Sequence, residues 1–368
     1  MKTRAKRVRS IVFCVLRRSL LVVLTVVVLV FAALVLVLNL IFNGPSPAAR
    51  DVLTMSMLES SGMKWCPALF IGEEKVEQIR TKVDVPFQDE VSDVSQIIIN
   101  ISDQPEATDE WKDYPDGIRI DEIFGNTYTA YVMLVRNPAD VYLATSTEVY
   151  SEEIPGTRIH NQIRTEGAIA AINGGAFNDD GTMGSYVGSL PEGLTVSKGE
   201  VVWDDGTCRD GFAGFNEDNV LVVSRKMTYS KAKEMKIRDG CSFGPALIIN
   251  GEVNDTQFAS NSGYNPRTAI GQRADGTVIF LCVNGRQAGS LGATYGDLID
   301  IMVEYGAVNA CNLDGGASSV MMYQDTYGRY GEAGEILMIN NHAVLQEQPR
   351  KMPTFFMVKP AGGSKGED

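Results

Sequence analysis

The sequence predicts a mixed α/β or α+β protein, in which a central mixed β-sheet with flanking helices follows an N-terminal transmembrane helix. Three observations predict this fold. Residues 19–42 form an uninterrupted apolar segment, short β-rich runs fill the chain from residue 117, and residues 277–313 read strand, helix, strand. A chain of 368 residues with 44% apolar and 21% charged residues is long enough for one large domain or two ordinary ones.

The N-terminal segment has the composition of a signal anchor. Residues 1–18 carry seven basic residues and no acidic one, and the 24 residues at 19–42 carry no charge. About 20 apolar residues cross a bilayer core, whereas a cleaved signal peptide has a shorter apolar region of roughly 7–15 residues. An uncleaved anchor is therefore favoured, although the small residues of SPAAR leave cleavage open. Because basic flanks stay in the cytoplasm, we expect a single-pass protein of the cell membrane with an extracytoplasmic C-terminal domain.

The net charge narrows the choice of partners. The whole chain carries −13 and its first 18 residues carry +7, so residues 19–368 carry −20. Such an acidic domain argues against nucleic acid and anionic membrane surfaces as partners. The membrane is expected as a partner through the apolar helix alone, and an anionic substrate would need a local cluster of arginines.

The cysteines and histidines argue against a metal site. Cys208 and Cys241 lie in polar, glycine-flanked segments and could form a disulfide in an exported protein. Cys282 and Cys311 lie inside apolar runs, where buried free thiols are common. The chain has no CxxC pattern and only two histidines, so these residues predict no metal site, and we expect no cofactor. A metal requirement of the reaction stays open at this stage.

Composition divides the chain into five parts. The segment after the apolar helix contains RDVLTMSMLES and EEKVEQIRTKV, whose spacing is helical, and it ends in the polar, turn-rich stretch ISDQPEATDEWKDYPD. The predicted parts are a basic cytoplasmic tail at 1–18, the anchor at 19–42, a linker with a helical stalk or cap at 43–115, the main domain at 116–362 and a tail at 363–368.

Residues 277–313 are the clearest structural unit of the main domain. TVIFLCV predicts a strand, ATYGDLIDIMVEYGA a helix, and AVNACNL a second strand. Thr294 and Asp297 are spaced to cap the helix, and Gly306 suits its C-terminal end. A strand–helix–strand unit of this length predicts a βαβ crossover between parallel strands. Asn284 and Asp314 then follow the two carboxyl ends, where α/β sheets place their ligand sites.

The same short motif, one polar residue followed by two glycines, occurs at the ends of two apolar runs. AIAAI is followed by Asn173, Gly174 and Gly175, and AVNACNL by Asp314, Gly315 and Gly316. Glycines let a ligand approach the backbone amides. Each motif alone could be a tight turn in which Asn or Asp bonds its own backbone. The two together favour a ligand site.

Basic and hydroxyl side chains near these motifs suit a phosphate group. A guanidinium binds phosphate oxygens through a planar fork, although any single arginine could equally be a solvated surface residue. Hydroxyl groups could bond a phosphate or a sugar, but no histidine is obviously placed to make one a nucleophile. The arginines are Arg267, Arg286 and Arg350, and the hydroxyl residues are Thr268, Ser318 and Ser319.

Four stretches in this order resemble the phosphodiester glycosidase family. They are AINGGAFND, SFGPALIINGEV, PRTAIGQRADGTVIFLCVNGRQ and LGATYGDLIDIMVEYGAVNACNLDGGASS, and the resemblance covers roughly residues 117–360. It implies that 116–362 is a catalytic domain that hydrolyses a sugar-1-phosphodiester. The family usually has an aromatic residue, an aspartate and a glycine where this chain has Ala176, Asn284 and Ala317.

The chemistry of this reaction suggests a role for each candidate residue. A phosphate leaving group needs little protonation, so charge complementarity and one carboxylate suffice. We expect Asp314, Asn173 and Arg267 to be catalytic, with Asp314 as the carboxylate that activates water, attacks or stabilises the oxocarbenium-like centre. The expected substrate-binding residues are Arg286, Gly174, Gly175, Thr268, Gly315, Gly316, Ser318, Ser319, Asn284 and Arg350.

The expected function is cleavage of a glycosidic C1–O–P bond in an extracytoplasmic glycoconjugate or cell-envelope polymer. Two alternatives remain open at this stage. One is a non-catalytic carbohydrate- or envelope-binding domain that keeps the fold, which Asn284 and Ala317 would favour. The other is a phosphodiesterase that cleaves the P–O bond instead.

Overall fold

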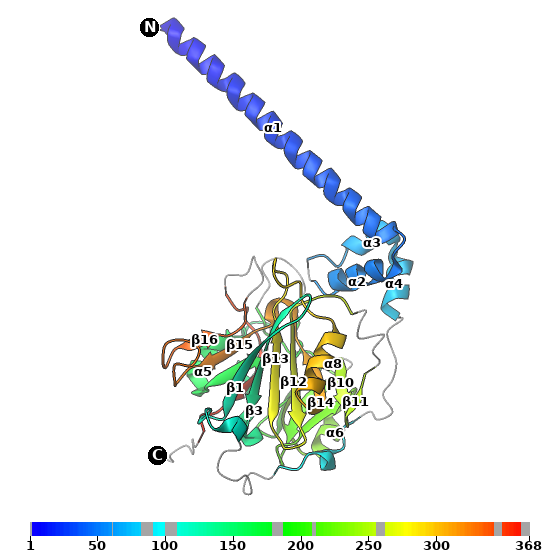
Figure 1. Ribbon diagram of the computed structural model, residues 1–368, viewed down its shortest axis with the longest axis vertical. Helices are drawn as coiled ribbons and strands as arrows, with labels where there is room; N and C mark the ends of the chain where they lie inside the picture. The colour runs from blue at the N-terminus through cyan, green and yellow to red at the C-terminus, as the bar shows by residue number, and fades with distance from the viewer. Residues whose placement is uncertain are drawn as a thin grey trace.

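The computed structural model describes residues 2–60, 62–81, 91–99, 109–178, 187–207, 211–254, 262–341 and 348–361. Figure 1 shows a long N-terminal helix, a small group of helices at its base and a β-rich body. Within these ranges, the helices of the body are α5 (Ile159–Glu166), α6 (Tyr229–Glu234) and α8 (Tyr295–Glu304), with short 3-10 helices at Val94–Gln96, Asp109–Trp111, Pro138–Asp140 and Gly316–Ser318. The tail predicted at 363–368 lies outside the described residues.

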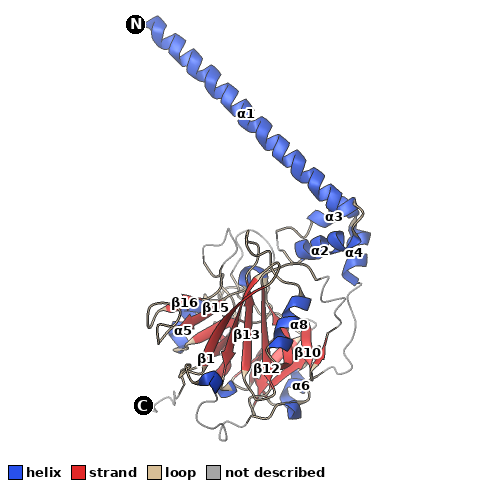
Figure 2. Ribbon diagram, in the orientation of Figure 1, coloured by secondary structure: helices blue, strands red, loops and turns tan. Residues whose placement is uncertain are grey.

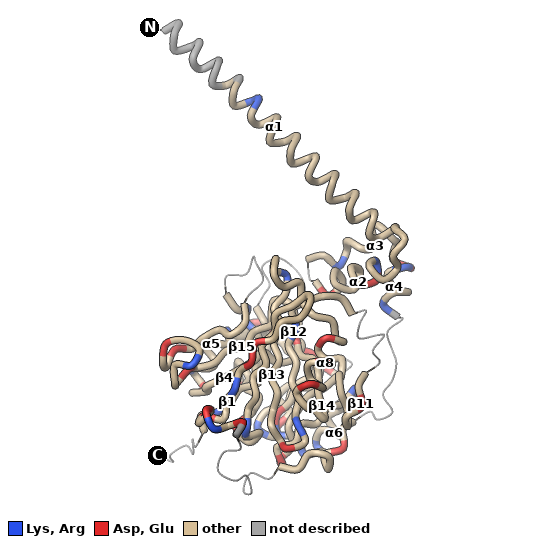
Figure 3. The backbone as a smooth tube through the Cα atoms, viewed as in Figure 1, with Lys and Arg blue, Asp and Glu red and all other residues tan. Residues whose placement is uncertain are grey.

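The N-terminal helix α1 (Lys2–Asn43) confirms the expected apolar helix. Its segment Val15–Asn43 is long and apolar enough to cross a membrane, and none of its most apolar stretch is buried by the rest of the protein. Figure 3 shows α1 in tan, without charged residues, from the single blue segment near its beginning to its base. The anchoring of this helix in a membrane remains a prediction.

Three helices at the base of α1 form what we call the helical cap, residues 47–81. They are α2 (Pro47–Leu58), α3 (Cys66–Ile71) and α4 (Glu73–Thr81), within the segment predicted to be a stalk or cap. Ser46 caps α2 by accepting a hydrogen bond from the backbone of Ala49, and Pro47 occupies its first turn. The cap has a small apolar core, so it is a packed unit and not an extended stalk.

The body contains three sheets, which Figure 2 shows in red. The seven-stranded sheet has the order β1 (Ile118–Phe124), β2 (Thr129–Val135), β13 (Val278–Val283), β12 (Arg267–Arg273), β14 (Ala307–Leu313), β10 (Ala246–Ile249) and β11 (Glu252–Val253). The second sheet has the order β16 (Ile336–Met338), β15 (Met321–Gln324), β4 (Ala170–Asn173), β17 (Thr354–Val358) and β3 (Val141–Thr145). The third has the order β6 (Glu200–Asp204), β5 (Leu194–Ser197), β9 (Ile237–Ser242), β7 (Phe212–Asn216) and β8 (Leu221–Ser224).

The predicted α+β fold class is confirmed, with one difference in the central sheet. All strand pairs among the described residues are antiparallel, whereas we expected a mixed sheet. β12 forms a hairpin with β13 and also pairs with β14, so β13 and β14 run in the same direction without touching. The strand–helix–strand unit at 277–313 therefore crosses over an intervening antiparallel strand.

The crossover helix α8 begins where the sequence predicts. Thr294 and Asp297 form a complete capping box, and Leu298, Ile301 and Met302 are buried against the seven-stranded sheet. The main core lies where the three sheets meet. Phe280, Phe356 and Phe215 come from one sheet each, and the rings of Phe215 and Phe356 meet edge to face with centroids 6.3 Å apart. This core fixes the ends of β4, β12 and β14 relative to one another.

Candidate functional site

The structure brings the two glycine motifs into direct contact. Asn173 ends β4 of the second sheet, and Asp314 follows β14 of the seven-stranded sheet. The Nδ2 amide of Asn173 donates to the carbonyl oxygen of Asp314 at 2.7 Å, and the amide of Asp314 donates to the carbonyl oxygen of Gly174 at 3.2 Å. The site therefore lies at a junction between two sheets and not along the edge of one.

The side chain of Asn173 is fully engaged inside the protein. It is completely buried, and its Oδ1 accepts hydrogen bonds from the Thr268 hydroxyl at 2.8 Å and from the Val320 amide at 3.1 Å. Its Nδ2 donates to the backbone of Asp314, as described above. A satisfied amide in this position holds β4, β12 and the Asp314 turn together. Asn173 and Thr268 thus position the site through these bonds, and a catalytic role for Asn173 stays a prediction.

The first glycine motif is closely packed. The amides of Gly174 and Gly175 donate to the carbonyl oxygen and to the hydroxyl of Thr354, at 3.0 and 3.1 Å. A Cβ on Gly174 would lie 2.4 Å from the Thr354 hydroxyl, and one on Gly175 would lie 2.6 Å from the Ser242 carbonyl oxygen. Close packing therefore explains these glycines, and both amides are engaged within the protein, while their contact with a substrate stays a prediction.

The second glycine motif also uses its own amides. Gly315 donates to Oδ1 of Asp314 at 2.9 Å, and Gly316, with a φ of 63°, donates to the carbonyl oxygen of Pro266 at 2.8 Å. The positive φ explains glycine at position 316. Asp314 is half-buried and supplies the carboxylate of this motif, whose two glycines have no side chain. The carboxylate is therefore the chemically competent group of this motif.

The guanidinium of Arg267 is buried in a protein-made cage. The residue is 3% exposed, and its Nε donates to the Ala293 carbonyl oxygen at 2.9 Å. Its Nη2 lies 3.1 Å from the carbonyl oxygens of both Ser262 and Gly263. The ring of Tyr295 covers one face, with the guanidinium carbon 3.8 Å from the ring centroid. Much of this arginine is thus committed to holding the loop before β12.

A carboxylate from the helical cap completes this cage. Glu59 directly follows α2, and its Oε2 accepts from Nη2 of Arg267 at 2.9 Å and from Nδ2 of Asn265 at 2.7 Å. The hydroxyl of Tyr295 makes a longer contact of 3.4 Å with Oε1. Burial raises the pKa of Glu59, and the charge of Arg267 opposes this rise. Donors on three side chains therefore converge on one anionic group.

Glu59 is a residue of this junction that the sequence did not reveal. It lies 206 residues before Asn265 in the chain, within a segment that the sequence suggested only as a stalk or cap. A second hydrogen bond joins the helical cap to the same loop, since the Ser56 hydroxyl accepts from the amide of Tyr264 at 2.9 Å. An acidic residue at the end of an amphipathic helix carries no signal of its own, because such residues are usually solvated.

Arg286 is the cation best placed to meet a ligand. Its Nη2 donates to Oδ1 of Asn265 at 3.1 Å, and a Cβ on Gly316 would lie 3.4 Å from its Nη1. The guanidinium therefore lies against the turn that carries Asp314. Burial and the charge of Arg267 lower the pKa of Arg286, while Glu59 acts in the opposite sense. Arg286 follows the end of β13, and its backbone is left-handed, with a φ of 56°.

Four predicted site residues remain, and their surroundings differ. The hydroxyls of Ser318 and Ser319 are buried and have no hydrogen-bond partner among the described residues, so they could serve a ligand. Asn284 is buried, and its Oδ1 accepts from the amide of Asn341 at 2.8 Å, a structural contact. Arg350 lies over Phe177, which closely follows the first glycine motif, with its guanidinium carbon 4.6 Å from the ring centroid.

The cysteines whose side chains the structure describes offer no nucleophile at this junction. Cys241, Cys282 and Cys311 are buried free thiols, and burial raises the pKa of Cys282 to about 12. Cys208, the partner considered for Cys241, lies outside the described residues. Across the described ranges, no group of three or more His, Cys, Asp or Glu side chains is arranged to hold a metal ion.

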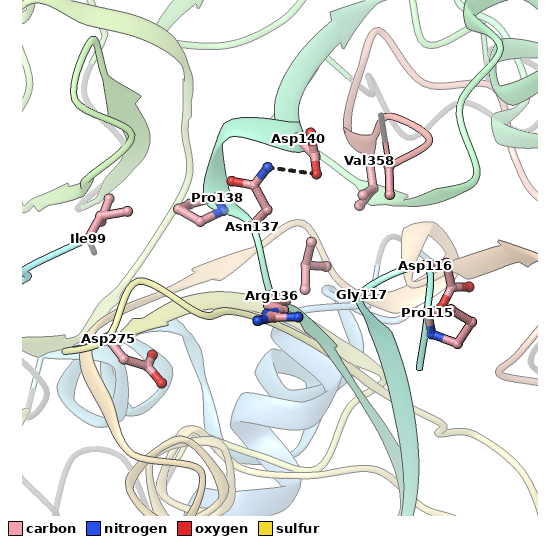
Figure 4. A pocket seen from close by; sticks show the side chains of 12 residues that line it. Ile99, Pro115, Asp116, Gly117, Arg136, Asn137, Pro138, Asp140, Asp275 and Val358 are labelled. Atoms are coloured by element: carbon pink, nitrogen blue, oxygen red, sulfur yellow. Dashed lines mark hydrogen bonds between the residues drawn. The ribbon is translucent and has the colours of Figure 1, made fainter. Parts of the chain in front are cut away.

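A separate cavity of about 340 Å³ lies at the end of the seven-stranded sheet that is opposite the two glycine motifs. Figure 4 shows its lining, which includes Arg136, Asn137, Asp140 and Asp275. Asp275 is in the turn after β12, whereas Arg267 begins that strand, so the length of the strand, roughly 20 Å, separates them. This cavity is not part of the junction.

Comparison with known proteins adds three findings. A family model described as phosphodiester glycosidase matches residues 166–359, which include both glycine motifs and the arginines of the junction. The SPbeta prophage-derived uncharacterized protein YomE of Bacillus subtilis is 29% identical over 171 residues. That match covers 44% of this chain but only 25% of YomE, so the chain spans about a quarter of that relative's length.

Several solved structures are similar at low identity. The catalytic domain of zebrafish N-acetylglucosamine-1-phosphodiester alpha-N-acetylglucosaminidase, auto-inhibited by its pro-peptide, has a TM-score of 0.49 and 19% identity over 66% of this chain and 82% of that one. A hypothetical protein from Synechocystis has a TM-score of 0.41 and 16% identity over 66% of this chain and 61% of that one.

Proposed function

Since the chain belongs to the phosphodiester glycosidase family, we propose that it hydrolyses the C1–O bond of a sugar-1-phosphodiester in an extracytoplasmic glycoconjugate or cell-envelope polymer. One observation carries the proposal. The turn that presents the Asp314 carboxylate lies against the guanidinium of Arg286. The charges of Arg267 and Glu59 also act on Arg286. Asp314 and two cations, one of which is paired with Glu59 in this structure, match a substrate with an electrophilic sugar carbon and an anionic leaving group.

The reaction breaks the bond between C1 and a phosphate oxygen, and a water oxygen takes its place on C1. The bonding electrons leave with the phosphate, whose added charge the guanidinium of Arg286 stabilises. Asp314 either takes the proton of the attacking water, attacks C1 itself or stabilises the positive charge that develops at C1. Asn173 and Thr268 hold the Asp314 turn in place through their hydrogen bonds.

Glu59 occupies the position where an anionic ligand would meet Arg267 and Asn265. Its carboxylate already accepts hydrogen bonds from both residues, at 2.9 and 2.7 Å. A substrate phosphate at this position competes with Glu59, or binds beside it at Arg286. We propose the first arrangement, because donors from three side chains converge there on one anionic group.

Labelled water distinguishes this reaction from its alternatives. The full chain is incubated with a chromogenic sugar-1-phosphodiester in water enriched in oxygen-18. Label in the free sugar supports C1–O cleavage, whereas label in the phosphate indicates a phosphodiesterase. Binding without turnover would favour a non-catalytic carbohydrate-binding domain, for which the structural role of Asn284 is the supporting observation.

The proposal also includes anchoring by α1. The apolar segment Val15–Asn43 is one helix of sufficient length, and we propose that it holds the catalytic domain on the outer face of the cell membrane. Alkaline extraction of isolated membranes tests this, because a spanning helix keeps the protein with the lipid. Release of the intact chain into the soluble fraction would contradict anchoring.

The two arginines are expected to respond differently to replacement. Arg286→Ala should raise KM by about tenfold or more with little change in the unfolding midpoint, because it removes charge-assisted bonds of about 1.5–3 kcal/mol to the phosphate. Arg267→Ala should also raise KM, because the phosphate bonds this guanidinium in place of Glu59. It should in addition lower the free energy of unfolding by about 3 kcal/mol, because it leaves Glu59 and buried carbonyl groups without their partner. Steady-state kinetics and thermal unfolding of both variants measure this difference. A destabilised Arg267→Ala protein with the wild-type KM would show that the phosphate does not displace Glu59 from Arg267.

A further inference from the structure

The helical cap exposes an apolar face beside the base of α1. Met63, Trp65 and Leu69 are 44%, 63% and 73% exposed. Trp65 and Leu69 are four residues apart at the start and within α3, so they lie on the same side of that helix. Grouped large apolar side chains with this much exposure mark an interaction surface.

The neighbour of this face is the end of the apolar helix. Leu38 and Phe42 of α1 pack in one cluster with Phe70 and Ile71 of α3. The rings of Phe42 and Phe70 are stacked, with centroids 5.0 Å apart. Figure 1 shows α3 next to the base of α1. The position of α3 is therefore fixed relative to the last turns of the helix that we propose to span the membrane.

Helix length sets the depth of this contact. At about 1.5 Å per residue, Val15–Asn43 is roughly 43 Å long, similar to a bilayer with both of its headgroup regions. Leu38 precedes Asn43 by five residues and thus lies about 7 Å inside the outer end of this segment. Side chains that contact Leu38 are at the level of the lipid headgroups.

We propose that Met63, Trp65 and Leu69 insert into the outer interface of the bilayer that α1 spans. This inference rests on the proposed anchoring by α1. Tryptophan prefers the membrane interface, and the indole nitrogen of Trp65 already donates to the carbonyl oxygen of Gly62 at 3.0 Å, so the ring enters lipid without an unsatisfied donor. Insertion depends on apolar burial, which reconciles it with the acidic charge of the domain.

Interfacial insertion would define the class of substrate that the site meets. The cap carries Glu59 into contact with Arg267, so the cap joins the membrane on one side and the junction on the other. Fixing the cap in the headgroup region holds the junction near the lipid surface. The substrates that reach it are then sugar phosphodiesters presented at the membrane, such as lipid-linked ones.

Tryptophan quenching by brominated lipids tests the insertion. The full chain is reconstituted in zwitterionic phosphatidylcholine vesicles whose acyl chains carry bromine either near the headgroup or deep in the core. The wild type is compared with Trp65→Phe, and with Trp203→Phe, which removes a tryptophan of β6 in the third sheet. Phe31→Trp within α1 reports insertion of that helix. We expect shallow bromine to quench the wild type, Trp65→Phe to lose at least half of this quenching, and Trp203→Phe to keep it.

Each result bears on the proposal. Equal quenching of the wild type and Trp65→Phe would overturn interfacial insertion. Stronger quenching of Trp65 by deep than by shallow bromine would also overturn it. Lack of quenching of Phe31→Trp would refute anchoring by α1 and with it the inserted cap, while leaving the hydrolysis of soluble substrates to be judged by the labelled-water experiment. Leu69→Ser, which retains all tryptophans, should lower the quenching of Trp65 by about half if the face acts as a unit.

Discussion

Replacement of Asp314 by Asn is expected to abolish turnover and to leave the fold intact. The rate should fall by about 10²–10⁴-fold, the contribution typical of a positioned carboxylate that transfers a proton or stabilises charge. Asparagine keeps an Oδ1 atom that can accept from the amide of Gly315, so the local turn should persist. The rate of hydrolysis of a sugar-1-phosphodiester and the unfolding midpoint of the variant measure the two parts of this prediction.

Asp275, at a turn of the same seven-stranded sheet, provides a matched control. Asp275 lies in the turn after β12, and its Oδ1 accepts from the amide of Thr277 at 2.9 Å, which resembles the local bond of Asp314. It faces the cavity at the far end of the sheet. Asp275→Asn should therefore keep the wild-type rate. Near-normal activity of Asp314→Asn would remove Asp314 from the chemistry, and comparable losses in both variants would indicate a general effect of turn stability.

Local sequence patterns predicted the elements that position Asp314. The spacing of Thr294 and Asp297 predicted the capping box of α8, and the apolar runs predicted the strands on either side. These signals are local, since each depends on residues within a few positions of one another. No local signal predicts that β12 lies between β13 and β14. The turn at 274–277 indicates that β12 and β13 form a hairpin, but it does not indicate that β14 will pair with β12 and not with β13.

The role of each glycine was the least predictable part of the site. A glycine next to a polar residue has the same appearance whether its amide faces a ligand or another backbone. Only the structure shows that Gly175 is required because Ser242 would meet a Cβ at 2.6 Å, and that Gly316 is required by its positive φ. The contribution of Glu59 could not be predicted for a related reason, since its partner Asn265 is 206 residues away in the chain.

Replacement of Glu59 by Gln is expected to strengthen anion binding while weakening the protein. Arg267 and Asn265 donate to the Glu59 carboxylate, and removal of its charge frees these donors for an incoming phosphate. A charge-assisted hydrogen bond contributes about 1.5–3 kcal/mol, so we expect inorganic phosphate to bind about tenfold more tightly or better. The same change leaves a buried guanidinium opposite a neutral amide, which should lower the free energy of unfolding by about 1–3 kcal/mol in the absence of phosphate.

Thermal unfolding as a function of phosphate concentration separates these two effects. The midpoint of Glu59→Gln without phosphate should lie below that of the wild type and should rise more steeply as phosphate is added. Glu77→Gln on α4 is the matched control, because its ion pair with Arg80 spans 3.8 Å between two largely exposed side chains and should contribute little. Adding Arg286→Ala to Glu59→Gln should remove most of the gain, since both guanidinium groups would share the bound phosphate. A variant that binds phosphate no better than the wild type would show that Glu59 braces the junction from the cap without occupying the anion site.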